Sequence, residues 1–300
     1  MRIILTGASG FIGKNLYEQL MGMHEIFPVD VKKTFKGQKR IDITKSNLEK
    51  AIPGNWDAIL HHAAIVSVPE SIKKPVETMR TNVIGTLNVL ELARKKDIGK
   101  VILASSAAVY GDCPELPLSE GACPKPLTPY GTSKLTNELN ALEYSRYYGI
   151  KTVAFRYFNV YGKYQNPGNP YSGVICKFLD NALSGKDIVI FGDGKQTRDF
   201  IHVDDVVQAN VIGLTKIKKS GVFNVCSGEE FSILDLANAI KKLTKSSSEL
   251  VFREKRDGDV YRSVGDAARL REYGFKPGTL ESGLQKTLDS AKKHSAGLVF

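Results

Sequence analysis

The first residues of the chain decide its fold: Arg2-Ile3-Ile4-Leu5-Thr6-Gly7-Ala8-Ser9-Gly10-Phe11-Ile12-Gly13. Residues 2–6 have the apolar character of a short buried strand, and a helical pattern follows over 10–21. The glycine spacing is a variant of the dinucleotide-binding fingerprint. Gly7 allows the tight turn out of the strand, and Gly10 lets the backbone approach a pyrophosphate at the helix N-terminus. We therefore expect a dinucleotide-binding α/β fold.

A second strand strengthens this expectation. Glu25-Ile26-Phe27-Pro28-Val29-Asp30 ends in an acid about 20 residues after the glycines, where a carboxylate that binds the adenosine ribose is expected. The charge of Asp30 would repel a 2′-phosphate, which favours NAD over NADP. Lys32 and Lys33 follow directly. These two cations could host a phosphate, although a solvated basic loop is the simpler interpretation.

Strand-like and helix-like segments alternate through the first half, which predicts a doubly wound parallel (Rossmann) sheet in an α/β protein. The expected strands are 2–6, 25–30, 57–61, 100–104 and 151–156, and the expected helices are 10–21, 45–51, 75–97 and 128–149. Beyond about residue 160 the expected helices are 173–184, 204–216, 232–245 and 279–294, with strands near 188–191 and 222–226. We expect an NAD-binding domain over 1–160 and a smaller C-terminal α/β substrate lobe over 161–300, partly interleaved with the first.

Tyr130 and Lys134 form a Tyr-x-x-x-Lys pair, and Ser106 lies upstream. Positions four apart share one face of a helix, so Lys134 is expected beside the Tyr130 hydroxyl. A nearby ammonium favours the phenolate and lowers the pKa of the tyrosine. Such a tyrosine can remove a proton from a sugar or alcohol hydroxyl near neutral pH.

The composition fits a soluble globular protein, with 300 residues, 42% hydrophobic and 25% charged. No apolar run is long enough to span a membrane, and no signal peptide is apparent. The four cysteines have no close-paired metal spacing, so we expect reduced thiols, no metal site and a cytoplasmic location. The net charge of +10 is spread along the chain without a nucleic-acid motif, so an anionic small substrate is the better explanation.

A set of motifs also appears in a fixed order along the chain. They are Thr6–Gly13, Asp30, Asp42-Ile43, His61-His62-Ala63-Ala64, Asn82, Ser105–Gly111, Tyr130–Lys134, Arg156–Gly162 and Gly192–Phe200. Together they resemble the extended short-chain dehydrogenase/reductases of the NAD-dependent epimerase/dehydratase family, and within it the UDP-glucose and UDP-N-acetylglucosamine 4-epimerases. The resemblance covers nearly the whole chain. It implies NAD as cofactor and a UDP-hexose as substrate.

The resemblance also implies a role for each matching residue. Catalysis falls to Tyr130, Lys134 and Ser106. Cofactor contacts fall to Gly7, Gly10, Phe11 and Ile12 at the pyrophosphate, Asp30 at the ribose, Asp42 and Ile43 at the adenine, and Ala63, Asn82, Lys134 and Phe158 elsewhere. Substrate contacts fall to Asn159, Arg198 and Arg256 at the diphosphate, Val174, Val189 and Phe191 around the uracil and its ribose, and Asp259 at that ribose. Two arginines suit a diphosphate, because a guanidinium fork matches phosphate oxygens.

Two alanines separate the possible reactions. Dehydratases and decarboxylases on this scaffold carry extra acid or base residues directly after the catalytic Ser or Thr, where this chain has Ala107 and Ala108. Methyl groups cannot transfer a proton. We therefore expect a 4-epimerase that oxidises C4, lets the keto sugar rotate and reduces it again. A 4,6-dehydratase or UDP-glucuronate decarboxylase remains the alternative, and a non-catalytic NAD-binding regulator is a second one.

Substrate size and assembly give two further expectations. In the family, a bulky residue narrows the sugar pocket, and the matching position in this chain is Ser263. Ser67 is a second candidate sugar contact. A small residue leaves room for an N-acetyl group, so UDP-GlcNAc and UDP-GalNAc are expected substrates alongside UDP-Glc and UDP-Gal. Family members dimerise through two long helices, here near 75–97 and 128–149. Val89, Leu90, Leu139 and Leu142 could serve either that interface or the core.

Overall fold

The computed structural model describes residues 1–168, 173–255 and 260–295. Within these ranges, seven parallel strands form one sheet in the order β11-β6-β5-β4-β1-β2-β3. The strands are β1 (Arg2–Thr6), β2 (Glu25–Asp30), β3 (Lys39–Arg40), β4 (Ala58–His61), β5 (Lys100–Ser106), β6 (Lys151–Tyr157) and β11 (Gly221–Val225). The chain winds from β1 outward in one direction and returns to β4 to wind in the other. This reversal creates the crevice where α/β sheets bind ligands.

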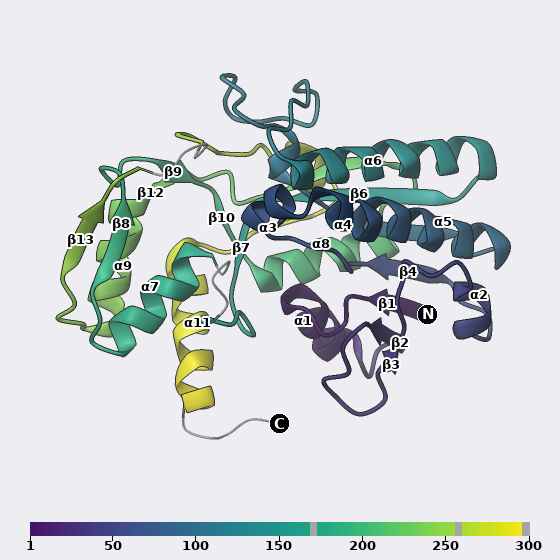
Figure 1. Ribbon diagram of the computed structural model, residues 1–300, viewed down its shortest axis with the longest axis horizontal. Coiled ribbons are helices and arrows are strands. Elements are labelled where there is room, and N and C mark those ends of the chain that lie inside the picture. Colours follow the sequence, from purple (N-terminus) through teal and green to yellow (C-terminus); the bar gives the residue numbers. More distant parts are fainter. Residues whose placement is uncertain (169–172, 256–259, 296–300) are drawn as a thin grey trace.

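Helices cover both faces of the sheet (Figure 1). On one face lie α1 (Phe11–Leu20) and α8 (Val203–Thr215), and on the other lie α5 (Gly85–Lys95) and α6 (Pro129–Tyr148). Side chains alternate along each strand, so Ile3 and Leu5 enter one apolar core while Ile4 enters the other. The predicted doubly wound α/β fold is confirmed.

The predicted helix over 75–97 is interrupted. It is built from α4 (Pro75–Met79), a π-helical turn η1 (Arg80–Ile84) and α5. Within η1, the Asn82 carboxamide accepts from the Ile65 N–H at 2.8 Å and donates to the Ile65 carbonyl at 3.0 Å. A π-turn inside a helix often marks a functional site. Here it secures the loop that follows β4.

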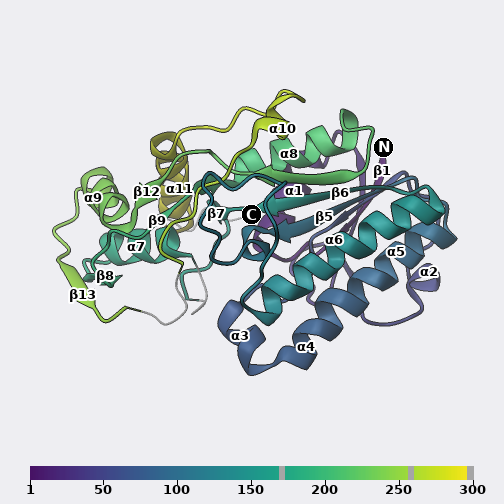
Figure 2. The same ribbon diagram turned by 90° about the horizontal axis from the view of Figure 1, so that it is seen from above.

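The smaller lobe lies beside the sheet, at the left of Figure 1. Its core is formed by α7 (Val174–Leu183), α9 (Ile233–Thr244), α11 (Leu280–Ser295) and the parallel pair β8 (Ile188–Phe191) and β13 (Leu250–Arg253). Figure 2 shows the same lobe from above, apart from α5 and α6. The pair β7 (Asn159–Tyr161) with β10 (Phe200–His202) lies between the two regions, and β9 (Thr197–Arg198) with β12 (Phe231–Ser232) lies beside α9 in the smaller lobe (Figure 1).

Several predicted elements differ in detail from the structure. The helix expected over 45–51 is reduced to α2 (Leu48–Ala51), and the short elements α3 (Val68–Lys73), η2 (Ala107–Val109) and α10 (Ala268–Arg271) were not predicted. β11 and α8 follow residue 161 in sequence, yet β11 pairs with β6 and α8 covers the main sheet. None of the four cysteines, all of which lie in the described ranges, forms a disulfide. Among the described residues, no helix combines the length and apolarity needed to cross a bilayer.

Candidate active site

A cleft of about 1390 Å³ lies where the sheet meets the smaller lobe. One wall consists of the turns that follow β1, β2, β4, β5 and β6, together with the start of α6. The other wall comes from β7, α7, β8, β9 and β10. Most predicted site residues line this single cleft: Gly7, Gly10, Phe11, Ile12, Asp30, Asp42, Ile43, Ala63, Ser67, Ser106, Tyr130, Lys134, Phe158, Asn159, Val174, Val189, Phe191 and Arg198.

The turn after β1 packs too closely for side chains at two glycines. Gly7 has φ +74°, and a Cβ there would lie 2.6 Å from the Ala63 nitrogen. A Cβ at Gly13 would lie 2.0 Å from the Gly7 carbonyl oxygen. No described side chain caps the N-terminus of α1, and its first turn has no acidic residue. Its backbone N–H groups and positive dipole therefore suit an anionic phosphate.

Two carboxylates lie beyond this turn. Asp30 accepts backbone N–H groups at both oxygens, from Ser9 at 3.0 Å and from Lys32 at 3.1 Å. Asp42 accepts the backbone N–H and hydroxyl of Thr44 at 2.9 and 2.8 Å. Both carboxylates are held as hydrogen-bond acceptors at the cleft surface, which suits the hydroxyl groups of a ribose and the amino edge of an adenine.

Asn82 lies behind the cleft wall. Its side chain is fully buried, and besides holding Ile65 it donates to the Ser133 hydroxyl at 2.9 Å. It therefore joins the loop after β4 to α6, and Asn82 is not among the residues that line the cleft. Ala63, on the same loop, does line it.

The three predicted catalytic residues meet at the start of α6. Thr128 caps this helix by accepting from the Gly131 N–H at 3.1 Å. Tyr130 and Lys134 then follow on one face, with exposed fractions of 9% and 4%. The Lys134 ammonium lies 5.7 Å from the centre of the Tyr130 ring and donates to the Ala104 carbonyl on β5 at 2.8 Å. Ser106 ends β5, two residues beyond Ala104.

Burial governs the ionisation of these groups. It raises the pKa of Tyr130, and a hydrogen-bonding contribution from Ser106 opposes that rise. Burial also lowers the pKa of Lys134 to about 8, against the opposing effect of the Glu138 carboxylate. The expectation that Lys134 lowers the Tyr130 pKa is therefore not met by the protein groups alone. The physical reason is that removing a phenolate from water costs more here than its neighbours return.

Two neighbouring histidines were quoted with the motifs but given no role. His61 links Thr6 at 2.7 Å to Thr86 at 2.9 Å, and His62 lies 3.0 Å from the Tyr157 hydroxyl. Burial lowers the pKa of each imidazole to about 3, so both rings stay neutral. His62 and Tyr157 line the cleft beneath the catalytic residues. The sequence did carry a signal for His62 and Tyr157, because they lie in the motifs His61–Ala64 and Arg156–Gly162.

The opposite wall carries the predicted substrate contacts. Asn159 donates its side-chain N–H to the Asp199 carbonyl at 2.8 Å, and Arg198 donates to the Thr197 carbonyl at 2.7 Å. No described side chain caps the N-terminus of α7, which begins at Val174 and has no acid in its first turn. The cleft therefore receives a second helix N-terminus suited to an anion. Gln165 and Gln196 also line it and were not predicted.

Of the three remaining predicted substrate contacts, only Ser263 lies within the described residues. Arg256 and Asp259 lie outside the described residues. Ser263 is half-buried in the segment before α10 and does not line the cleft. Ala107 and Ala108 form the short turn η2 directly after Ser106, and a Cβ at Gly131 would lie 2.6 Å from the Ala108 carbonyl oxygen. The two methyl-bearing residues are thus packed between β5 and α6.

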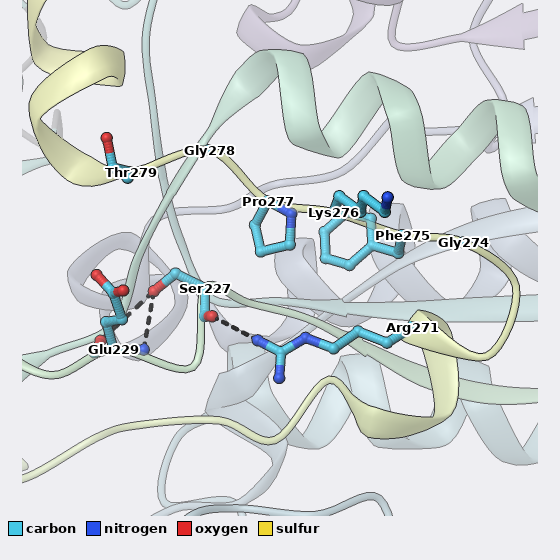
Figure 3. Close-up of a pocket in the computed structure, with 9 residues that line it drawn as sticks. All are labelled: Ser227, Glu229, Arg271, Gly274, Phe275, Lys276, Pro277, Gly278 and Thr279. Atoms are coloured by element: carbon cyan, nitrogen blue, oxygen red, sulfur yellow. Dashed lines mark hydrogen bonds between the residues drawn. The ribbon is translucent and has the colours of Figure 1, made fainter.

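A second hollow of about 450 Å³ shares no lining residue with the cleft (Figure 3). It is lined by Ser227, Glu229, Arg271 and residues 274–279. Arg271 donates to the Ser227 carbonyl at 2.9 Å. None of the predicted site residues contributes to it. No metal-binding group of three or more His, Cys, Asp or Glu side chains occurs among the described residues.

Comparison with known proteins agrees with this geometry. The family model for the NAD dependent epimerase/dehydratase family matches residues 3–226. The chain is 33% identical to a UDP-glucose 4-epimerase of Mycolicibacterium smegmatis, over 98% of this chain and 100% of that protein. It is 36% identical to a UDP-N-acetyl-alpha-D-glucosaminuronate decarboxylase of Bacillus cytotoxicus, over 96% of each chain.

A solved structure is equally similar in fold. The UDP-N-acetylglucosamine 4-epimerase of Methanobrevibacter ruminantium, in complex with UDP-N-acetylmuramic acid, matches with a TM-score of 0.93 and 32% identity over 98% of each chain. From the family match, and from a cleft that brings Ser106, Tyr130 and Lys134 to a glycine-rich turn, the chain belongs to the NAD dependent epimerase/dehydratase family.

Proposed function

We propose that this protein inverts the configuration at C4 of a UDP-hexose. The observation that carries the proposal is a single cleft with Ser106, Tyr130 and Lys134 on one wall and two helix N-termini, of α1 and α7, facing into it. Two anion-binding helix ends suit two diphosphates, one of a dinucleotide and one of a sugar nucleotide. The cleft volume of about 1390 Å³ is ample for both.

The residues present fit NAD. The close packing at Gly7 and Gly13 leaves a backbone cradle at the start of α1. Asp30 provides acceptors for ribose hydroxyls, and its charge disfavours a 2′-phosphate. When bound, NAD would accept the hydride from C4 of the sugar and later return it, and it would add a positive charge to the site.

The protein residues supply the proton transfers. Tyr130 as phenolate removes the proton of the sugar 4-hydroxyl, directly or through Ser106. Lys134 holds the phenolate by its charge, and its bond to the Ala104 carbonyl fixes it against β5. The keto sugar then rotates about its link to the diphosphate and presents its other face. Tyr130 returns the proton, and the cycle needs no further acid or base.

The alanines after Ser106 support epimerisation over elimination or decarboxylation. Ala107 and Ala108 occupy η2, beside the start of α6. Dehydratases of the family typically carry an acid and a base at this place, and decarboxylases commonly carry a Glu, whereas neither methyl group can transfer a proton. The similarity to a decarboxylase makes this distinction worth testing.

The range of substrates is a finer part of the proposal. Asn159 and Arg198 hold the diphosphate, and Val174, Val189 and Phe191 surround the uracil and its ribose, with Arg256 and Asp259 as further contacts. Ser67 caps α3 by accepting from the Glu70 N–H at 3.0 Å, and it lines the cleft near Tyr130. We include UDP-GlcNAc and UDP-GalNAc among the substrates beside UDP-Glc and UDP-Gal because of the sequence resemblance, since Ser263 does not line the cleft and lends this part no support.

We also propose a homodimer through the helices near 75–97 and 128–149. Val89 and Leu90 are fully buried, so they belong to the core. By contrast, Val76, Leu139 and Leu142 are 73%, 56% and 39% exposed on the outer face of α4 and α6. Exposed apolar side chains on neighbouring helices favour a protein partner. Light scattering of the protein and of Leu139→Arg tests this: a dimer that dissociates in the variant is expected, and a monomeric parent contradicts it.

The activity itself is tested with a panel of UDP-, dTDP- and GDP-sugars, read at the C4 proton by NMR. We expect inversion of UDP-glucose and of UDP-GlcNAc. A 4-keto-6-deoxy or pentose product establishes a lyase, and no product with any sugar establishes a non-catalytic role. If UDP-glucose is inverted and UDP-GlcNAc is not, only the proposal that N-acetylated sugars are substrates is lost.

A further inference from the structure

A buried carboxylate lies directly behind the catalytic residues. Glu138 is one helical turn beyond Lys134 on α6, and its side chain is 3% exposed. Arg156 on β6 donates to both its oxygens, from Nε to Oε1 at 2.9 Å and from Nη2 to Oε2 at 2.7 Å. Ser105 on β5 donates its hydroxyl to Oε1 at 2.5 Å. One carboxylate thus joins α6, β5 and β6, and each of these elements contributes residues to the cleft.

The strand register shows why this junction matters for the cleft. Ser105 pairs with Arg156 across β5 and β6, and Ser106 pairs with Tyr157 one position later. Ser106 and Tyr157 both line the cleft. Successive side chains of a strand point to opposite faces. Glu138 therefore binds the two residues that immediately precede this pair.

Lys134 makes a second attachment of the same kind. Its ammonium donates to the Ala104 carbonyl, so Lys134 and Glu138, on consecutive helical turns, bind the consecutive residues Ala104 and Ser105. A displacement of α6 along β5 would break both contacts together. Both attachments hold α6 against the end of β5, where Tyr130 and Ser106 lie on the two elements.

Arg156 is itself held in place. Its guanidinium lies 4.6 Å from the centre of the Tyr110 ring. Tyr110 is fully buried and donates its hydroxyl to the Asn224 side-chain oxygen on β11 at 2.7 Å. The partner of Glu138 is therefore fixed by a neighbouring strand, and the bidentate pair has one well-defined geometry.

We propose that Glu138 is a positioning residue for the reaction proposed above. Its carboxylate, held by Arg156, fixes α6 against β5 through Ser105 and so sets the geometry between Ser106 and Tyr130. It touches neither substrate nor cofactor. The inference rests on the proposed function, because its kinetic readout is C4 epimerisation.

The variant Ser105→Ala tests this most cleanly. It removes one hydroxyl contact to Glu138 and leaves the buried ion pair intact, so the protein is expected to fold. Glu138→Gln is the stronger second variant. The matched control is Ser145→Ala, which removes the bond to the Ser220 hydroxyl at 2.6 Å on the same helix, far along α6 from Tyr130. Measured quantities are kcat, KM, bound NAD and Tm.

Since a 1 Å misplacement of reacting groups can cost about 100-fold in rate, we expect kcat to fall roughly tenfold in Ser105→Ala and further in Glu138→Gln. KM and bound NAD stay within about twofold of the parent, and Ser145→Ala keeps its kcat. The proposal is overturned if the folded Ser105→Ala variant keeps the kcat of the parent. It is also overturned if Ser105→Ala and Ser145→Ala have the same Tm and lose kcat to the same extent.

Crystal structures of the parent and Ser105→Ala give a readout that needs no turnover. The proposal expects the Tyr130 hydroxyl to lie at a changed distance from Ser106 in the variant, and an unchanged distance contradicts it. A parent protein that inverts no sugar contradicts the proposed function instead, and the structural comparison then still decides this inference.

Discussion

The two walls of the cleft are built in different ways. The wall with Ser106, Tyr130 and Lys134 stands on parallel strands, and a buried Glu138–Arg156 pair with 3% and 4% exposure locks its helix to them. The opposite wall, with Asn159 and Arg198, rests on strands of two or three residues, β9 and β7, and its polar groups bond to nearby backbone. The proposed catalytic residues are therefore held by long, paired strands, whereas the proposed substrate contacts lie on short strands.

Replacing Tyr130 by Phe is expected to have the largest effect. The ring keeps its packing, but the group that removes and returns the proton is lost. We expect kcat to fall about 1,000-fold, with NAD still bound and Tm nearly unchanged. The NMR assay at C4 and the absorbance of released NAD measure both quantities. Unchanged turnover would remove Tyr130 from the mechanism and leave the rigid wall without its assigned chemistry.

Gly13→Val tests the cradle in the rigid wall. A Cβ at this position would lie 2.0 Å from the Gly7 carbonyl oxygen, so the turn after β1 must move. We expect the purified variant to lose its bound NAD and to be destabilised by about 1–3 kcal/mol. Gly99→Ala is the control, because no described atom lies within 4 Å of its added Cβ. Retention of NAD by Gly13→Val would refute the assigned role of this turn.

Arg198→Met tests the recognition wall. Loss of a charged donor to the diphosphate is expected to raise KM about 10- to 100-fold and to change kcat little, since such bonds contribute about 1.5–3 kcal/mol. Arg2→Met serves as control, because Arg2 pairs with Glu25 at 3.0 Å at the far end of β1. A loss confined to kcat would show that Arg198 acts in the reaction rather than in substrate binding, and would contradict the proposed difference between the two walls.

The smallest expected effect is the change that Lys134→Met makes in the pH dependence of the unfolding free energy. Burial lowers the Lys134 pKa from 10.5 to about 8, so between these values the unfolded chain binds more protons than the folded one. Stability of the parent should therefore rise with pH relative to the variant, by roughly 2 kcal/mol between pH 7.5 and 10. Urea unfolding measures this. A constant difference would show that Lys134 is not held in the assigned environment.

Over the same range the parent should lose activity above about pH 8, because the uncharged amine no longer holds the phenolate. Stability that rises while kcat falls is the expected combination for a buried catalytic lysine.

The rigid wall could be predicted from the sequence almost completely. Strand periodicity, the glycine turn and the Tyr-x-x-x-Lys spacing are local signals, and the five predicted strands before residue 160 differ by at most two residues at either end from β1, β2, β4, β5 and β6. The recognition wall was harder, because two-residue strands such as β9 carry no periodicity. The π-turn at Asn82 was missed because the residues over 75–97 predict one continuous helix, and the contact of Asn82 with Ile65 is tertiary.

The pKa of Tyr130 could not be predicted from spacing either. Spacing shows that Lys134 is near, but the dominant effect is burial of the phenol, which depends on how α6 meets β5. The role of Glu138 was hidden for the same reason, since Ser105 and Arg156 reach it only through the register of two strands.

The most direct test of the central claim follows UDP-glucose in D₂O by proton NMR with the purified holoenzyme. If Tyr130 removes and returns only the hydroxyl proton and the C4 hydride stays within the site, UDP-galactose forms with its C4 proton fully retained and no deuterium on any sugar carbon. Deuterium at C5 or C6, or no inversion at C4, would contradict this mechanism.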